Sequence, residues 1–281
     1  MKKDETSQVV TLKSSEQLND TITRAHVSGP IKHASIASGH ASSYILGGND
    51  ALPEQFPYLV SLRRSDVRRH FCSAAIVNVR WILTAAHCIT GNIDFAYELV
   101  NVVGTISATS DEGHWYDTAL FVLHPEWNPS VFRHDVALIE TTEYIEFGPM
   151  VFPIRLTPDH FGGGVTATMA GFGQTTQEPI IDSKQYLDME TMTNADCRRF
   201  YSRLPFNAVR IFDSNICLFH PQGRGGCGGD SGASITVNQI SVGIASWIGG
   251  PCDGGIPDVF ARTANYYYWI RNVTELNRIE E

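Results

Sequence analysis

An all-β barrel or sandwich that ends in a single helix is the fold class that the sequence predicts. Beyond residue 44, apolar runs of about five to seven residues are separated by Gly, Pro, Asn and Asp, as in antiparallel strands joined by turns. Sustained helical periodicity is missing until the last part of the chain. Many short strands followed by one late helix indicate a closed barrel or a two-sheet sandwich.

The elements follow in chain order. Eight segments have the composition of strands, namely PYLVSL, SAAIVN, RWILTAA, ALFVL, DVALIE, VTATMAGFG, ASITV and ISVGIASW. The C-terminal segment TANYYYWIRNVTELNRI places large apolar side chains at helical spacing, namely Tyr266, Trp269, Ile270, Val273 and Leu276. Such a stripe predicts an amphipathic helix docked on the body of the protein.

Length, composition and charge fit a soluble globular protein and exclude several partners. The chain has 281 residues, 43% hydrophobic and 18% charged, enough for one large domain or two modest ones. Its formal net charge of −9 argues against binding to nucleic acids or anionic membranes, because both require a basic face. No apolar run approaches the roughly 18 to 20 residues that span a bilayer.

Six cysteines predict disulfides and an oxidising compartment. They stand at positions 72, 88, 197, 217, 227 and 252, and none forms a CxxC pair typical of zinc or redox sites. An even number of well-separated cysteines suits three disulfides, although spacing alone leaves the pairing open. Disulfides of this kind indicate a secreted, extracellular protein. The N-terminal MKKDETSQVV has the lysines of a signal peptide but no apolar stretch behind them, so we expect that the sequence is written here without its leader.

The first 44 residues differ in composition from the rest of the chain. They are rich in Ser, Thr and His and poor in large apolar side chains, and they show no sustained period. Such a segment has little apolar surface to bury, so we expect it to be flexible. It is interpreted as a propeptide, with a plain disordered tail as the alternative.

Three residues in suitable local settings predict nucleophilic catalysis. Ser231 lies in the glycine-rich GRGGCGGDSG, His87 ends the apolar WILTAAHC, and Asp135 opens HDVALIE. A serine hydroxyl needs a base to take its proton, and the base needs a third group that fixes its tautomer. The order His, Asp, Ser excludes α/β-hydrolases, which run Ser, acid, His.

The motifs TAAHC, HDVAL and GDSG together resemble the signatures of the chymotrypsin-like (trypsin-fold) serine peptidases. The resemblance implies two six-stranded antiparallel β-barrels, residues 45–155 and 156–281, the second ending in the terminal helix. His87 and Asp135 would belong to the first barrel and Ser231 to the second. The resemblance implies no cofactor and no metal for the chemistry.

Catalytic roles and disulfides are carried over from the family by position. Ser231 would be the nucleophile, His87 the general base and then acid, and Asp135 the residue that orients the imidazole. The N–H groups of Gly229 and Ser231 would form the oxyanion hole. The implied disulfides are Cys72–Cys88, Cys197–Cys217 and Cys227–Cys252. One departure is Cys72-Ser73-Ala74, where the family usually has Cys-Gly-Gly.

The segment YILGG, residues 44–48, is similar to the family's activation junction and implies a zymogen. Cleavage would free the amine of Ile45 to pair with Asp230, because an unpaired buried carboxylate is very costly. The family junction usually follows Arg or Lys, so Tyr44 favours a chymotrypsin-like activating protease. In the uncut form, two residues match the positions that hold this acid in related zymogens, Ser61 and His70.

The specificity pocket is the least conventional part of the resemblance. The family's pocket floor lies six residues before the nucleophile, at Gly225, which leaves it without the charge that trypsin-like members use. Asp258 stands where a glycine is usual, and the pair resembles the brachyurin group, which accepts aromatic, large apolar and some basic residues. At the mouth, Ile248 or Gly249 would decide the opening. Three residues would pair with substrate backbone, Ser246, Trp247 and Ile248.

The sequence therefore predicts a secreted serine endopeptidase with a preference for aromatic or large apolar residues before the cut. An elastase-like or narrow regulatory cascade protease is one alternative, and a binding protein on a protease fold is the other. Expected partners are polypeptide substrates, an activating protease and protein protease inhibitors, with the enzyme itself a monomer. Sequons at Asn19 and Asn272 predict glycosylation.

Overall fold

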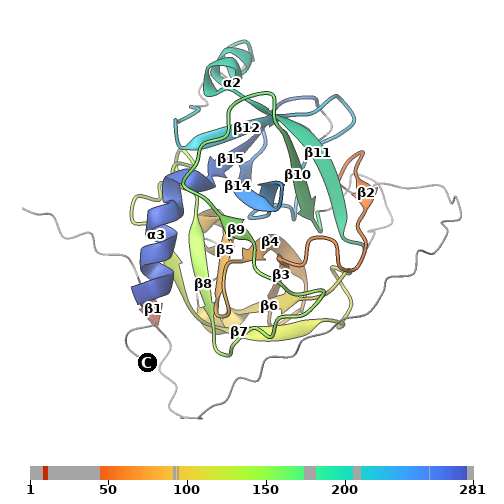
Figure 1. Ribbon diagram of the computed structural model, residues 1–281, viewed down its shortest axis with the longest axis vertical. Coiled ribbons are helices and arrows are strands. Elements are labelled where there is room, and N and C mark those ends of the chain that lie inside the picture. The colour runs from red at the N-terminus through yellow and green to blue at the C-terminus, as the bar shows by residue number, and fades with distance from the viewer. Residues whose placement is uncertain are drawn as a thin grey trace, which may run out of the picture.

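The computed structural model describes residues 9–11, 45–90, 93, 95–173, 182–204, 210–252 and 254–276. Figure 1 shows two groups of strands placed against each other, with one helix running along their side. Strands make up most of the regular secondary structure in the described residues, as the sequence predicts. Of residues 1–44, the structure describes only a short strand.

The first barrel contains six strands in a closed antiparallel arrangement. Their order is β7-β6-β3-β4-β5-β8, and pairing of β7 with β8 closes the ring. The short β1 (Val9–Thr11) pairs with β7 from outside, with Val9 opposite Val122. The six strands are β3 (Leu59–Arg64), β4 (His70–Ile76), β5 (Trp81–Thr84), β6 (Leu99–Val103), β7 (His114–Leu123) and β8 (Ala137–Thr141).

The second barrel repeats this arrangement. Its order is β10-β13-β14-β15-β12-β11, closed by pairing of β10 with β11. Two short strands are added to this ring: β2 (Asn49–Asp50) pairs with β11, and β9 (Arg155–Leu156) pairs with β14. Its strands are β10 (Thr166–Gly171), β11 (Gln185–Met192), β12 (Asn215–Phe219), β13 (Ser234–Val237), β14 (Ile240–Trp247) and β15 (Asp258–Arg262). The predicted pair of six-stranded barrels is confirmed.

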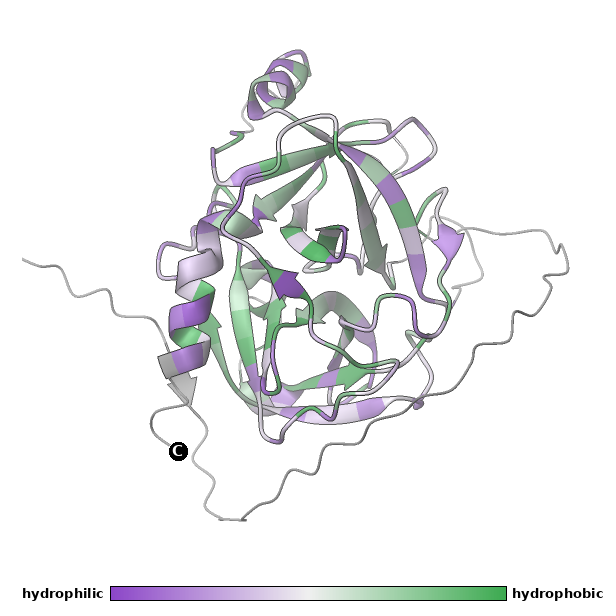
Figure 2. Ribbon diagram, viewed as in Figure 1, coloured by the Kyte–Doolittle hydropathy of each residue, from purple (hydrophilic) through white to green (hydrophobic). Residues whose placement is uncertain are grey.

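Each barrel is filled by apolar side chains from its own strands. In β3, the largest fully buried apolar side chain is Leu62, and its neighbours in the first core include Ile76 and Leu138. The second core gathers Leu187, Ile235 and Phe260. In Figure 2, green hydrophobic stretches dominate several strands of both barrels, while purple bands mark the helices.

Three α-helices and one 3-10 turn are the other elements in the described residues. The turn is η1 (Ala96–Glu98), and the helices are α1 (Ala86–Ile89), α2 (Asn194–Tyr201) and α3 (Thr263–Leu276). The predicted α3 buries Tyr266 and Ile270 in the core of the first barrel, so it clamps the two barrels together. Among the described helices, none has the length and apolar character that a membrane crossing requires.

Helix α2 was not expected from the sequence. Thr193 caps its first turn, because its hydroxyl oxygen accepts the backbone N–H of Asp196 at 3.1 Å. Ser, Thr and Asp are favoured at this position since they satisfy N–H groups that the helix leaves free. The spacing of Thr193 and Asp196 was therefore a usable local signal.

Three disulfides have the pairing that the family resemblance implies, Cys72–Cys88, Cys197–Cys217 and Cys227–Cys252. The first joins β4 to α1 and closes a loop with a sequence separation of 16. Replacing Cys72 and Cys88 together by alanine is expected to lower the free energy of unfolding by about 3 kcal/mol, because the unfolded chain regains loop entropy. Urea unfolding of the Ser231→Ala protein with and without the pair measures this, and equal midpoints would contradict it.

Candidate active site at the junction of the two barrels

The histidine and the acid come together because two neighbouring strands of the first barrel end beside each other. Thr84 of β5 pairs with Ala137 of β8, His87 follows β5 on α1, and Asp135 precedes β8. His87 Nδ1 lies 2.8 Å from Asp135 Oδ2. The backbone N–H of His87 donates to Asp135 Oδ1, also at 2.8 Å. The carboxylate therefore fixes both the ring and the chain that carries it.

The second barrel supplies a further contact to the same acid. Ser246, on β14, donates its hydroxyl to Asp135 Oδ2 at 2.5 Å. Asp135 is 1% exposed and Ser246 5% exposed. A buried carboxylate is tolerated when several donors face it, and here three do so. Ser246 thus links the second barrel to the acid of the first.

The loop that carries Ser231 is held between the barrels. The backbone N–H of Ser73 donates to the Ser231 carbonyl at 2.8 Å, and the N–H of Gly232 donates to Ala245 at 2.8 Å. A β-carbon on Gly232 would lie 2.2 Å from the Thr84 hydroxyl, so the backbone there packs directly on the end of β5. Ser231 thus sits beside the segment that leads into α1 and His87.

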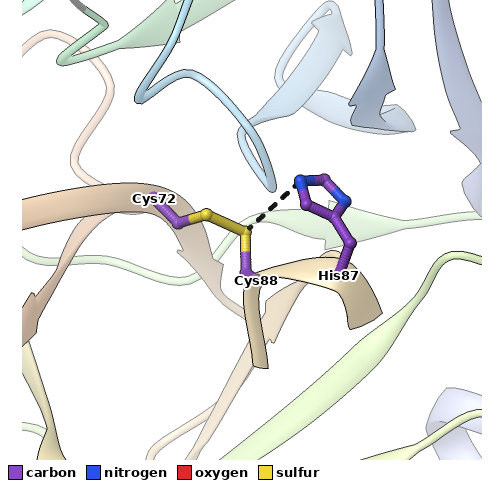
Figure 3. Close-up of side chains that lie close together, drawn as sticks. All are labelled: Cys72, His87 and Cys88. Carbon is purple, nitrogen blue, oxygen red and sulfur yellow. Dashed lines mark hydrogen bonds between the residues drawn. A yellow bond between two sulfur atoms is a disulfide. The ribbon is translucent and has the colours of Figure 1, made fainter. Parts of the chain in front are cut away.

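The His87 ring also lies against a disulfide. Figure 3 shows its Nε2 directed toward Cys88, and the distance to Sγ is 4.0 Å. Cys72 and Cys88 are bonded to each other, so neither has a thiolate to offer a metal. The ring of Phe132 lies 5.7 Å from the imidazole and shields another side. These contacts leave 21% of the His87 side chain exposed.

A second group of side chains has ligand atoms close together but the wrong geometry for a metal. His124, Glu126 and His134 place one ligand atom each within 4.8 Å of the others. The two imidazole rings are stacked at an interplanar angle of 17° with centroids 5.1 Å apart. Lone pairs on near-parallel rings run side by side instead of converging on one ion, so this cluster is better explained as packing against Tyr266.

The loop around Gly229 is oriented by a chain of hydrogen bonds. The Arg63 Nε–H donates to Ser61 Oγ at 3.1 Å, and Ser61 lies 2.9 Å from His70 Nδ1. His70 Nε2 lies 3.0 Å from the Gly229 carbonyl. Because Arg63 only donates and the carbonyl only accepts, Ser61 donates to Nδ1 and His70 carries its proton on Nε2. Burial lowers the pKa of His70 to about 4, so the ring is neutral.

Ser73 adds a second donor to the same carbonyl, with its hydroxyl 3.0 Å from the Gly229 oxygen. This residue replaces the first glycine of the family's Cys-Gly-Gly. Gly229 has a φ of +96°, a conformation that disfavours a side chain. Within the described residues, the N–H groups of Gly229 and Ser231 have no hydrogen-bond acceptor, so both can donate to a bound group.

The zymogen contact expected for Ser61 and His70 is not the one that the structure contains. His70 was expected to hold Asp230, but it contacts the Gly229 carbonyl instead. The Asp230 carboxylate accepts backbone N–H groups from Gly173 and Cys227, both at 2.9 Å. Those donors occupy its oxygens, so His70 has no place on the acid in this conformation.

Asp230 is a buried acid without a described cationic partner. Burial raises the pKa of Asp230, the two N–H donors lower it, and the charge of Asp258 raises it. The net result is a pKa of about 7. Ile45 is fully buried in the second core, and the Leu46 carbonyl accepts the N–H of Gly225 at 3.1 Å. Tyr44, on the other side of the expected junction, lies outside the described residues.

A pocket opens beside Ser231, between the loop of residues 226–231 and strands β14 and β15. Its volume is about 140 Å³, and Asp258 and Ile248 are in its wall, as expected. Ile248 rather than Gly249 lines the mouth, and it is 39% exposed. The remaining lining residues include Met169, Gly226, Ser246, Trp247 and Phe260.

Gly225, expected at the pocket floor, does not line the pocket. A β-carbon there would lie 2.3 Å from the Cys252 carbonyl and 2.7 Å from the His220 ring. The space toward which a side chain would point is therefore filled from behind. Gly226 takes the lining position, and the sequence analysis missed His220 entirely.

Two closed β-barrels with a histidine, an acid and a serine at their junction define the class of chymotrypsin-like serine endopeptidases. A profile of the family described as Trypsin matches residues 45–270. The chain is 30% identical over 235 residues to brachyurin of Leptuca pugilator, covering 82% of this chain and 98% of that protein. It is 30% identical over 229 residues to chymotrypsin-2 of Vespa crabro, with shares of 81% and 98%.

Among solved structures, neuropsin, a serine protease expressed in the limbic system of mouse brain, is similar. The TM-score is 0.71 and the identity 25%, covering 81% of this chain and 98% of that one. The chain therefore belongs to the trypsin family and is a serine endopeptidase.

Proposed function

We propose that this enzyme cleaves polypeptides with Ser231 as nucleophile, His87 as general base and Asp135 as its orienting acid. The contact of His87 with Asp135 beside the Ser231 loop carries the proposal. Asp135 keeps a proton on Nδ1, so Nε2 has a lone pair for the Ser231 hydroxyl. The alkoxide attacks the scissile carbonyl, and the imidazolium then protonates the leaving amine. Water, activated by His87 in the same way, then hydrolyses the acyl-enzyme and frees Ser231.

Charge that develops on the carbonyl oxygen would be held by the N–H groups of Gly229 and Ser231. Both N–H groups lack an acceptor in the described part of the chain, which supports this role. Donors that are already aimed at the developing charge need no reorganisation during the reaction, and one such donor typically contributes about 3 to 4 kcal/mol.

Activation by cleavage after Tyr44 fits the surroundings of Asp230. A carboxylate with a pKa raised by burial is poised to gain a cation, and the new ammonium of Ile45 would supply it. The protein would be made as a zymogen for secretion, cut by an activating protease, and controlled by protein inhibitors. Asn272 is exposed on α3 and is the candidate glycosylation site, whereas Asn19 lies outside the described residues.

The pocket supports a preference for aromatic or large apolar residues before the cut. Its volume of about 140 Å³ is close to the roughly 150 Å³ of an apolar cavity that holds a benzene ring. Met169, Val259 and Phe260 give it apolar walls. Ile248 at the mouth favours the elastase-like alternative, in which small aliphatic residues are preferred. A cleavage profile on a peptide library separates the two.

A covalent serine-directed probe tests the proposal. Protein cut between Tyr44 and Ile45 is expected to be labelled at Ser231, with the uncut protein labelled at least about a hundredfold more slowly because Asp230 lacks its partner. The Ser231→Ala protein, cut in the same way, is the matched control. Labelling of the cut protein at another residue, or equal labelling of uncut and cut protein, would contradict the mechanism or the zymogen respectively.

A further inference from the structure

A buried histidine stands behind the specificity pocket, where no motif predicts one. His220 follows β12 and is 1% exposed, and its Nε2 lies 3.5 Å from Asp258 Oδ1. The other oxygen of Asp258 accepts the N–H of Gly226 at 2.9 Å. Asp258 lines the pocket and His220 does not, so the histidine faces the pocket only through the acid.

The surroundings of His220 favour the protonated ring. Its Nδ1 lies 3.2 Å from the Pro221 carbonyl, which only accepts, so Nδ1 carries a proton. A neutral ring would then direct the lone pair of Nε2 at the Asp258 carboxylate. Protonation replaces that repulsion by an ion pair in a low-dielectric setting. Burial lowers the pKa of His220, but Asp258 and nearby carbonyls outweigh it and raise the pKa above 6.5.

The ring has room because position 225 is a glycine. A β-carbon on Gly225 would lie 2.8 Å from His220 Nε2, so any side chain there would displace the imidazole. The absence of a side chain at 225 and the presence of a cation behind it therefore belong together. The pocket therefore has Asp258 in its wall and His220 behind that acid, in the space that Gly225 leaves.

We propose that His220 sets the charge of the specificity pocket through Asp258, so that the protonated pair favours an aromatic or apolar substrate side chain and deprotonation of His220 admits arginine or lysine. The inference rests on the proposed function, because it assigns selectivity to that same site. When His220 is charged, the pair is neutral and a cationic substrate meets a compensated acid. When His220 loses its proton, Asp258 keeps an unpaired negative charge that a guanidinium can neutralise.

Two other titratable groups face this pair. Asp230 approaches from the loop around Gly229, and Tyr201 approaches from α2 with its hydroxyl donated to the Pro257 carbonyl. Burial, with the charge of Asp258, keeps the Tyr201 pKa well above its usual range, so this phenol stays neutral. In the described part of the chain, no lysine or arginine forms an ion pair with Asp258. In the cut enzyme the Ile45 ammonium would hold Asp230 ionised, so His220 is the group whose proton decides the local charge.

The test is the ratio of kcat/KM for two peptide anilides that differ only in having Arg or Phe before the cut. Both substrates use the same reacting groups, so the pH dependence that they share cancels in the ratio, and arginine stays charged throughout. The Arg-to-Phe ratio of the cut wild-type enzyme is expected to rise by about tenfold or more between pH 6 and pH 9, as Asp258 loses its counter-ion. A ratio that stays flat while Phe is cleaved overturns the inference and leaves the proposed function intact.

Two variants supply matched controls. His220→Gln cannot titrate, so its ratio is expected to be flat and near the alkaline value of the wild type. Asp258→Asn is expected to be flat and near the acidic value. A histidine with a purely structural role would lower kcat/KM for both substrates equally and leave the ratio unchanged. If cut protein cleaves neither substrate, the proposed function fails instead.

A second measurement needs no variant and no catalysis. Benzamidine, a benzene ring that carries an amidinium, probes the pocket by competitive inhibition of the wild-type enzyme or by direct binding to it. Its affinity is expected to rise by about tenfold over the same pH range. Reciprocally, binding of the cation must lower the pKa of His220, which the imidazole resonances report by NMR. Affinity that does not change with pH would contradict the proposal.

Discussion

Replacing Asp135 by asparagine is expected to lower kcat by about 10⁴-fold while leaving the fold intact, the size of the effect in chymotrypsin-type triads. The Asp135 carboxylate accepts three hydrogen bonds, from the His87 backbone, the His87 ring and Ser246. An asparagine has one acceptor oxygen. If that oxygen keeps the backbone N–H of His87, the amide NH₂ faces Nδ1 and forces it to accept. The ring proton then moves to Nε2, which has no lone pair left for Ser231.

Ser246→Ala is the matched control, because it removes one donor to the same carboxylate without changing the tautomer of His87. Its expected loss is about tenfold, the value of one hydrogen bond to a charged group. Hydrolysis of a peptide anilide by protein cut after Tyr44, normalised to folded enzyme, measures both variants. If Asp135→Asn lost no more activity than Ser246→Ala, the orienting role of Asp135 would be wrong.

The strands predicted from the sequence are largely apolar runs in which the inner polar residues are only Ser or Thr. The missed strands β6, β12 and β15 carry larger buried polar residues, which disguise them. Asn101, in the middle of β6, is satisfied by Thr118 and the Tyr116 carbonyl of a neighbouring strand. Arg262, at the end of β15, donates to groups as distant in sequence as Phe161. These partners become visible only when the barrel is closed.

Strand β11 was not predicted from the sequence for another reason. QYLDMETM alternates buried and exposed side chains as an antiparallel strand should. Its exposed positions are Asp188 and Glu190, and Met189 points inward between them. Asp and Glu are depleted in strands, so composition concealed a period that was present.

The candidate catalytic residues could be proposed from the sequence because each lies in a local motif, whereas the contacts that support them could not. Ser73 was seen only as a departure from Cys-Gly-Gly, and its bond to Gly229 spans 156 positions. Arg63 reads as an ordinary strand arginine, yet it is fully buried on Ser61. His220 is packed behind Gly225, and nothing in either local sequence couples them. Local pattern thus specifies the reacting groups, and tertiary packing specifies their electrostatics.

The uncut protein is expected to lose stability as the pH rises from about 4 to about 7, because of Asp230. Burial raises the pKa of this acid from 3.8 to about 7 in the folded chain. Over this interval the unfolded chain releases a proton that the folded chain retains, so rising pH favours unfolding. The full shift corresponds to a loss of up to about 4 kcal/mol. Below about pH 4 the carboxyl is neutral in both states and the effect vanishes.

Urea midpoints between pH 4 and pH 8 measure this, in a Ser231→Ala background that prevents self-cleavage. Asp230→Asn is expected to cost about 1 kcal/mol at pH 4, where the wild-type carboxyl is protonated, since one of the two N–H donors from Gly173 and Cys227 loses its acceptor. The same variant should lose the decline between pH 4 and pH 7. Asp188→Asn, which removes an exposed carboxylate of β11, is the control for net charge and should keep the decline.

Cleavage after Tyr44 should reverse the sign of the dependence. The ammonium of Ile45 stabilises the ionised form of Asp230, which brings its folded pKa below 3.8. Stability from this pair is then present above pH 4 and lost as the pH falls through the lowered pKa. Cut Asp230→Asn in a Ser231 background should therefore remain as inactive as uncut protein, because no ion pair orders the loop around Gly229. Full activity in that variant would show that the free amine acts elsewhere, and a decline that persists in uncut Asp230→Asn would assign the buried proton to another group.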